Sequence, residues 1–360
     1  MINLLIVLFN LFTKKGKKML NNQDFAQFRA KSLGGSDVAA ILGLSPYRSA
    51  VDVWMEKTGK PIEMKDSLPL RFGSFAEEFV ASEYSRHTGY SLINHPYAIT
   101  HPSYPYFGGH IDRFVTKASI TPSSDVAKLE YARGQLAAID GAVIEKLLEC
   151  KTANPFMQQQ WGDAGTDQVP LPYLCQCLWY MAITQVNQTD LAVLFGNADF
   201  RIYHIARDLQ LEQMLLEKAD YFWNQYVLKD TPPPAQSEAD YQSLFTKTTL
   251  AKSVEASSEL VKSIGHISKV QQRIDQGEEE LSKIKQQVMA TLQDAEILTY
   301  QGKTLATWKA PKPTVRLDAK QLEKDHPALV AQYQNTSQST RRLLIKPAVS
   351  QEATYKDVSQ

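Results

Sequence analysis

The sequence predicts an α/β fold followed by a helical appendage, and three patterns support this prediction. The apolar residues Val143, Ile144, Leu147 and Leu148 lead into the segment Leu-Glu-Cys-Lys-Thr at 148–152, which is typical of a buried strand. Prolines and glycines punctuate residues 104–115, and apolar residues follow them, as expected of a turn that leads into a second strand. Apolar side chains recur every three or four positions over 260–292, as they do in a long helix.

The strand at 148–152 carries a charged pair. Glu149 and Lys151 are two residues apart, so they share one face of the predicted strand. Such a pair is either a solvated face or a functional site. Metal-assisted cleavage of a phosphodiester uses both groups, because the carboxylate holds a divalent cation and the ammonium helps to orient or acidify the attacking water.

The strand at 104–115 contributes a second acid, Asp112. A lone aspartate there is either a strand-end cap or a metal ligand. Paired across a hairpin with Glu149, Asp112 forms one arm of a magnesium site, because Mg²⁺ prefers oxygen ligands and typically takes one or two carboxylates together with substrate phosphate.

The remainder of the chain supplies helices and boundaries. An amphipathic helix is expected over 208–228, with its aromatic side chains used for packing, and three consecutive prolines follow at 232–234. The apolar repeat over 260–292 predicts a long helix or a helical hairpin broken near Gly277, and a β-hairpin over 297–308 turns at Gln301–Gly302.

These boundaries predict four segments after the N-terminus. They are a large domain over 19–230, a linker over 231–250, a helical hairpin with a short β-hairpin over 251–330, and a flexible tail over 331–360.

The N-terminus has an unusual order. An apolar stretch over 2–12 precedes the basic run Lys-Lys-Gly-Lys-Lys at 14–18, whereas a signal peptide places its charge first. About eleven apolar residues are too few to span a bilayer. We therefore expect translation to begin at Met19 and residues 1–18 to be a non-native extension, with a weak membrane anchor as the alternative.

Composition excludes several classes of protein. The three cysteines argue against a disulfide framework, and Cys175 and Cys177 are too close together for a structural zinc or an iron–sulfur cluster, even with Cys150. Lys plus Arg and Asp plus Glu both number 39, so any DNA-binding surface must be a local cationic groove.

Five sequence blocks, in a fixed order, carry a family resemblance. They include Gly-Gly-Ser-Asp at 34–37, Phe-Gly-Ser-Phe-Ala-Glu-Glu at 72–78, the segment 101–112, the segment 148–152, and Pro-Leu-Pro-Tyr-Leu-Cys-Gln at 170–176. Over roughly residues 24–228 the chain resembles the YqaJ-type viral recombinases, relatives of phage lambda exonuclease. The resemblance implies a restriction-endonuclease-like (PD-(D/E)XK) core with a mixed β-sheet flanked by helices.

The resemblance also implies roles for individual residues. Asp112 and Glu149 match the metal carboxylates, with the backbone carbonyl of Cys150 as a third ligand. Lys151 matches the catalytic lysine, and Glu77 matches a helix-borne acid that reaches a metal or its water.

Four further residues match family positions. Tyr173 and Gln176 are three apart, share a helix face, and resemble the active-site tyrosine and glutamine. Arg29 and Ser36 resemble a pocket for a DNA 5′-phosphate, which an arginine fork and a hydroxyl beside a Gly-Gly turn suit chemically.

The chain departs from the family pattern around Asp112. The family often has Ser-Pro-Asp-Gly where this chain has His-Ile-Asp-Arg at 110–113, so the role of that serine does not carry over. An insertion is expected over 117–140, and it introduces Asp140 as the alternative metal ligand. Asp140–Gly141 also has the sequence of a tight turn that starts a strand.

The function implied by the resemblance is a Mg²⁺-dependent double-strand DNA exonuclease, with Mn²⁺ as a substitute metal. It would digest from 5′ ends and leave 3′ single strands for phage-type recombination. The alternatives are a structure-specific endonuclease on the same core and a non-catalytic protein that binds DNA ends. The expected partners are duplex DNA ends, a single-strand annealing protein and further copies in a trimer, without a membrane. The expected location is the cytoplasm of a bacterial host that carries the phage or prophage.

Overall fold

The computed structural model describes residues 28–61, 67–119, 128–250, 252–312, 315, 317–333 and 341–345. The chain divides into two compact units, Met1–Leu244 and Phe245–Gln360. The predicted extension over 1–18 and the start at Met19 lie outside the described residues.

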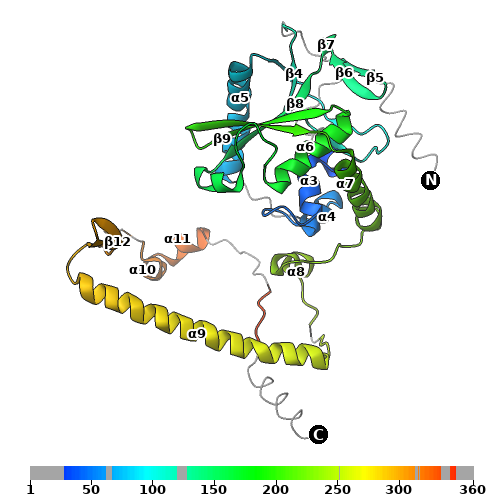
Figure 1. The fold of residues 1–360 in the computed structure, drawn as a ribbon. Helices are drawn as coiled ribbons and strands as arrows, with labels where there is room; N and C mark the ends of the chain where they lie inside the picture. Colours follow the sequence, from blue (N-terminus) through cyan, green and yellow to red (C-terminus); the bar gives the residue numbers. More distant parts are fainter. Residues whose placement is uncertain are drawn as a thin grey trace, which may run out of the picture. The chain divides into compact units, whose positions relative to one another are not determined.

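A five-stranded mixed sheet forms the centre of the first unit (Figure 1). Its strand order is β1 (Ser91–Ile93), β4 (Arg113–Thr116), β8 (Lys146–Ala153), β9 (Gln188–Phe195) and β10 (Asp199–Ala206). Strands β8 and β9 are parallel, and all other neighbours are antiparallel. The predicted strand around Glu149 is therefore a central strand of the sheet.

Helices cover both faces of this sheet, and β8 and β9 contribute buried apolar side chains to both faces. Leu148 packs with Val80 and Tyr84 of α5 (Leu68–Thr88) on one face. Leu147 lies in the larger core on the other face, which α3 (Gly35–Ile41), α6 (Leu171–Thr184) and α7 (Leu209–Phe222) share. Helix α6 also makes the crossover that a parallel pair such as β8 and β9 requires. This arrangement confirms the predicted fold class.

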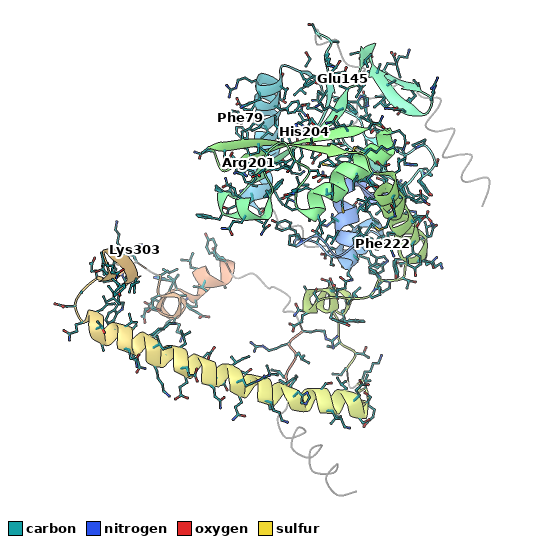
Figure 2. The ribbon with its side chains drawn as sticks, viewed as in Figure 1. Phe79, Glu145, Arg201, His204, Phe222 and Lys303 are labelled. Atoms are coloured by element: carbon teal, nitrogen blue, oxygen red, sulfur yellow. The ribbon has the colours of Figure 1, made fainter. Side chains whose placement is uncertain are left out.

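The predicted helix over 208–228 is α7 continued by a π-helical turn, Trp223–Val227. Phe222 (labelled in Figure 2) is 2% exposed, so an aromatic side chain of this helix serves the core as expected.

The first unit also contains α4 (Ala50–Lys57), the 3₁₀ turn Pro155–Gln160 and α8 (Glu238–Leu244). Helix α8 lies within the predicted linker. Its buried Asp240 accepts the backbone N–H groups of Gln236 and Ser237, which holds the start of the helix in place. The first unit therefore extends beyond the predicted end at residue 230.

The expected insertion between β4 and β8 forms a small antiparallel sheet of β5 (Leu129–Ala132), β6 (Gln135–Ile139) and β7 (Ala142–Val143). A two-stranded sheet of β2 (Ile99–Thr100) and β3 (Gly108–Gly109) lies before β4 in the chain.

The second unit is built around α9 (Ser258–Leu292), which is one continuous helix. This corrects the predicted helical hairpin: Gly277 costs about 1 kcal/mol in a helix but does not break it when strong helix formers such as the neighbouring Glu and Gln residues surround it. The predicted β-hairpin is β11 (Ile297–Tyr300) and β12 (Lys303–Thr307), and Gln301 and Gly302 have the positive φ of its turn.

Helices α10 (Ala319–Asp325) and α11 (Pro327–Gln332) follow, and most of the predicted tail over 331–360 lies outside the described residues. In the part of the chain that the structure describes, we find no helix with the length and apolar character needed to cross a membrane.

Candidate active site

Glu149 lies in the middle of β8 and is 1% exposed. Its Oε1 accepts hydrogen bonds from Lys151 Nζ and from Gln176 Nε2, the latter at 2.6 Å. Its Oε2 is also buried, and within the described residues it has no hydrogen-bond partner. A buried carboxylate oxygen without a donor is costly, so this atom marks a place where a ligand is expected.

Asp112 lies directly before β4. The antiparallel pairing of β4 with β8 ends at Arg113 opposite Leu148, and one further step of that register places Asp112 opposite Glu149. Its Oδ2 accepts the backbone N–H of Cys150 at 2.8 Å. The structure thus brings the two predicted acids together across neighbouring strands.

The electrostatics of this pair follow from burial and mutual repulsion. Burial raises the pKa of Glu149 to about 8, and the negative charge of Asp112 adds to the increase while Lys151 opposes it. Burial also raises the pKa of Asp112, and the positive charge of Lys151 opposes this increase. Burial alone would lower the pKa of Lys151, but the charges of Glu149 and Asp112 outweigh it and raise that pKa, so the ammonium stays protonated.

The helix-borne acid Glu77 lies on α5 and is bound to an arginine. Its Oε1 accepts a hydrogen bond from Arg113 Nη1 at 2.8 Å. The buried Arg113 side chain also donates to Glu78 on α5 and to the backbone carbonyl of Asp112. Arg113 therefore connects the helix that carries Glu77 to the strand that carries Asp112.

Tyr173 and Gln176 lie on α6, and Gln176 contacts Glu149 while Tyr173 lies near Lys151. Gln176 Nε2 contacts Tyr180 Oη at 3.1 Å in addition to Glu149, so the amide has a fixed position. The Tyr173 ring stacks on Trp161 with a centroid distance of 5.1 Å, and its own centroid is 5.9 Å from Lys151 Nζ.

The two residues predicted to bind a 5′-phosphate lie near α3 and α4. The Arg29 side chain is about half exposed, and its Nε lies 3.4 Å from Glu56 Oε1. Ser36 is exposed in the first turn of α3. The next residue, Asp37, pairs with Arg48 at 3.0 Å and with Lys57 at 2.9 Å. Arg48 and Lys57 are thus both paired with a buried carboxylate next to Ser36 in the chain.

The alternative ligand Asp140 lies away from this pair, in the tight turn between β6 and β7. Asp140 and Gly141 both have positive φ, as the turn requires, and Asp140 Oδ1 accepts the backbone N–H of Lys128 at 2.6 Å. Its surroundings match the turn interpretation.

Among the described residues, no three or more His, Cys, Asp and Glu side chains are grouped so as to hold a metal ion. Asp112 and Glu149 nevertheless fit a hard cation, because Mg²⁺ uses one or two carboxylates and completes its shell with water and substrate oxygens. The unpartnered Glu149 Oε2 is the structural observation that supports this fit.

The sequence of residues 24–187 matches the model of the YqaJ-like viral recombinase domain. This segment contains all the acids considered for the site: Glu77, Asp112, Asp140 and Glu149. Residues 24–187 form a YqaJ-like viral recombinase domain. The match confirms the resemblance predicted from the five sequence blocks.

Other proteins are similar over longer stretches. The uncharacterized protein YqaJ of Bacillus subtilis (strain 168) is 25% identical over 306 residues, which covers 83% of this chain and 86% of that protein. Among solved structures, the alkaline exonuclease LHK-Exo of Laribacter hongkongensis, in complex with dAMP, is 17% identical with a TM-score of 0.43. That alignment covers 58% of this chain and 94% of LHK-Exo. A phage-related exonuclease from Haemophilus somnus 129PT is 11% identical with a TM-score of 0.36, over 56% of this chain and 96% of that one.

Three residues of the site were not identified from the sequence: Arg113, Trp161 and Tyr180. Arg113 directly follows Asp112, and a buried arginine beside a predicted metal ligand could have been suspected from that adjacency alone. Tyr180 is four residues after Gln176 and shares its helix face, so its spacing could have identified it, whereas Trp161 reaches the site by stacking on Tyr173, which spacing does not reveal.

Proposed function

We propose that this protein is a Mg²⁺-dependent double-strand DNA exonuclease that digests from 5′ ends and leaves 3′ single strands. Membership in the YqaJ-like viral recombinase family supports a nuclease that acts in phage-type recombination. The observation that carries the proposal is the buried, unpartnered Oε2 of Glu149, beside Asp112 and a permanently charged lysine.

Asp112 and Glu149 would hold the metal, and the Cys150 carbonyl is suitably placed to assist. The N–H of Cys150 bonds to Asp112, and the N–H and C=O of one strand residue point to the same side, so this carbonyl also faces Asp112. When bound, the ion would polarise the phosphoryl oxygen and lower the pKa of an attached water, and Mn²⁺ would substitute for Mg²⁺.

The chain's own groups prepare the site for this chemistry. Gln176 fixes the orientation of Glu149 from α6, so the carboxylate does not need to reorganise. The charges of Glu149 and Asp112 raise the pKa of Lys151, which favours its role as a cation that orients or acidifies the attacking water. Tyr173, stacked on Trp161, forms a rigid wall beside the ammonium.

Arg29 and Ser36 would select the end of the DNA. A terminal 5′-phosphate carries more charge than an internal diester, so it gains more from a charged fork and a hydroxyl. This preference would make the enzyme begin at ends and would favour 5′ to 3′ digestion. The proposed setting is the cytoplasm of a bacterial host, with an annealing protein to receive the single strand and a trimer as the assembly expected from the family.

A digestion time course on end-labelled linear duplex and on closed circular duplex tests the proposal. We expect mononucleotide release from the 5′-labelled end of the linear DNA and no nicking of the circle. Nicking of closed circles would favour the structure-specific endonuclease, and binding of ends without any cleavage in Mg²⁺ or Mn²⁺ would favour the non-catalytic end-binding protein.

A further inference from the structure

Helix α9 carries an uncharged stripe along its whole length. Starting at Leu260, alternating steps of three and four residues meet no charged side chain, although the helix as a whole is rich in Glu and Lys. One set of these positions is aliphatic throughout: Leu260, Ile267, Ile274, Leu281 and Val288. The other set is small or aliphatic: Ser263, Val270, Gly277, Ile284 and Thr291. This is the pattern of a coiled-coil seam over five heptads.

The described part of the second unit leaves this stripe uncovered. Ile267 and Val270 are 44% exposed, and Ile284 is 57% exposed. The side chains drawn along α9 can be followed in Figure 2. In proteins, a helix gains most of its stability from packing an apolar face, so a helix with an open seam of this length is expected to have a partner.

We propose that α9 pairs in antiparallel orientation with α9 of a second copy of this chain. If the two-fold axis of the pair passes between residues 275 and 276, the two α9 helices lie side by side over almost their whole length. It places Ile274 opposite Gly277, so a large side chain meets the position without one, and it places Val270 opposite Leu281. The end layers likewise combine a large and a smaller residue, Leu260 with Thr291 and Val288 with Ser263.

The charges favour the same orientation. The half of α9 before residue 275 has three basic residues and one acidic residue, whereas the half from 275 onward has four acidic and two basic residues. Antiparallel pairing brings opposite halves together. Beside the seam, Arg273 of each copy would lie near Glu280 of the other. A parallel pair would instead place Gly277 against Gly277 and leave a gap at its centre.

Cysteine cross-linking in the full chain tests both the pairing and its direction. The double variant Ile267→Cys/Ile284→Cys places the two thiols opposite each other only in the antiparallel pair. The three native cysteines are buried, so the unmodified chain is the control. Under mild oxidation we expect the double variant to form a covalent dimer of twice the 40.5 kDa chain mass, and Ile267→Cys alone to stay monomeric on a non-reducing gel.

Other results would overturn the proposal. Equal cross-linking of Ile267→Cys alone would mean a parallel pair, and absence of cross-linking in the double variant would mean that α9 does not pair with itself.

A mass measurement provides the second test. Ile274→Lys puts a charge into the centre of the seam, and a buried unpaired charge is costly. It should weaken pairing through α9 at least about 100-fold in sedimentation equilibrium, whether the units that pair are single chains or the proposed trimers. The matched control Gln272→Lys adds the same charge outside the seam and should leave the dissociation constant within about twofold. Circular dichroism checks that both variants keep the helix. An unchanged dissociation constant in Ile274→Lys, with the helix intact, would contradict the proposal.

Discussion

Replacing Lys151 by methionine isolates the role of the ammonium group, because methionine keeps an unbranched chain of similar length. The Glu149 carboxylate loses the ion pair at Oε1 but keeps the hydrogen bond from Gln176 at 2.6 Å. The acids therefore stay in place while the fixed cation disappears. In the unmodified chain the charge of Lys151 lowers the pKa of Glu149. Removing that charge therefore raises this pKa above its value of about 8.

The expected loss in cleavage rate is large. Removing a positioned acid–base or electrostatic group typically costs about 10²–10⁴-fold in rate, or roughly 3–5 kcal/mol in the barrier. DNA binding should change by less than about tenfold, because one cation is a small part of the phosphate contacts that dominate affinity. The Mg²⁺ concentration for half-maximal rate should rise, since protons compete better for Glu149 in the variant.

Single-turnover cleavage of an end-labelled duplex, measured with DNA affinity and thermal stability, checks this prediction. Lys146→Met is the matched control on the same strand. Lys146 lies five residues away, on the opposite face, and its Nζ pairs with the buried Asp190 at 2.7 Å. This control should lose stability but keep its rate constant, since Tyr84 and His204 still bind Asp190. A Lys151→Met enzyme with more than a tenth of the normal rate, or an equal loss in both variants, would refute the assignment of Lys151.

Three further predictions concern other residues. Asp112→Asn should be inactive in the same assay and Asp140→Asn nearly normal, because only Asp112 lies beside Glu149; the reverse pattern would move the metal site to the insertion. Duplex ends with a 5′-phosphate should be cut faster than 5′-hydroxyl ends, and Arg29→Ala should remove most of this preference, about 1.5–3 kcal/mol for a lost charge-assisted bond; equal rates on both ends in the unmutated enzyme would argue against the pocket. Burial raises the pKa of Asp37, but Lys57 and Arg48 outweigh it and lower that pKa below its usual range. The stability that Asp37 provides is therefore complete above about pH 4 and is lost as the pH falls through the lower folded pKa. Asp37→Asn should thus cost about 3–5 kcal/mol in urea unfolding at pH 7 and less at pH 3, and an equal cost at both pH values would contradict this reasoning.

The parts of the fold that sequence could predict are those with a local signature. The apolar residues before Glu149 identified its strand, and the turn residues Gln301 and Gly302 located the C-terminal hairpin. The order of the sheet was not readable from alternation, because the pairing of β8 with β9 joins segments that α6 separates. The family resemblance implied a mixed sheet flanked by helices but not the order of its strands.

The boundaries were less predictable than the elements. Three prolines in a row suggested the end of the first domain, but α8 follows them, and its Leu244 packs against the core of that unit. Gly277 suggested a break that the structure does not have. Both errors come from weighing a local signal without the packing that overrides it.

Arg113 changes the interpretation of Glu77. A glycine at this position, as in the family pattern, would leave the acid on α5 free to approach a metal. In this chain Glu77 Oε1 is already bound to a buried guanidinium that also binds the Asp112 carbonyl. Direct metal binding through that oxygen would require breaking a charge-assisted hydrogen bond, which is worth about 1.5–3 kcal/mol. Glu77 is therefore better suited to hold a water through its second oxygen, with Arg113 setting the distance between helix and strand.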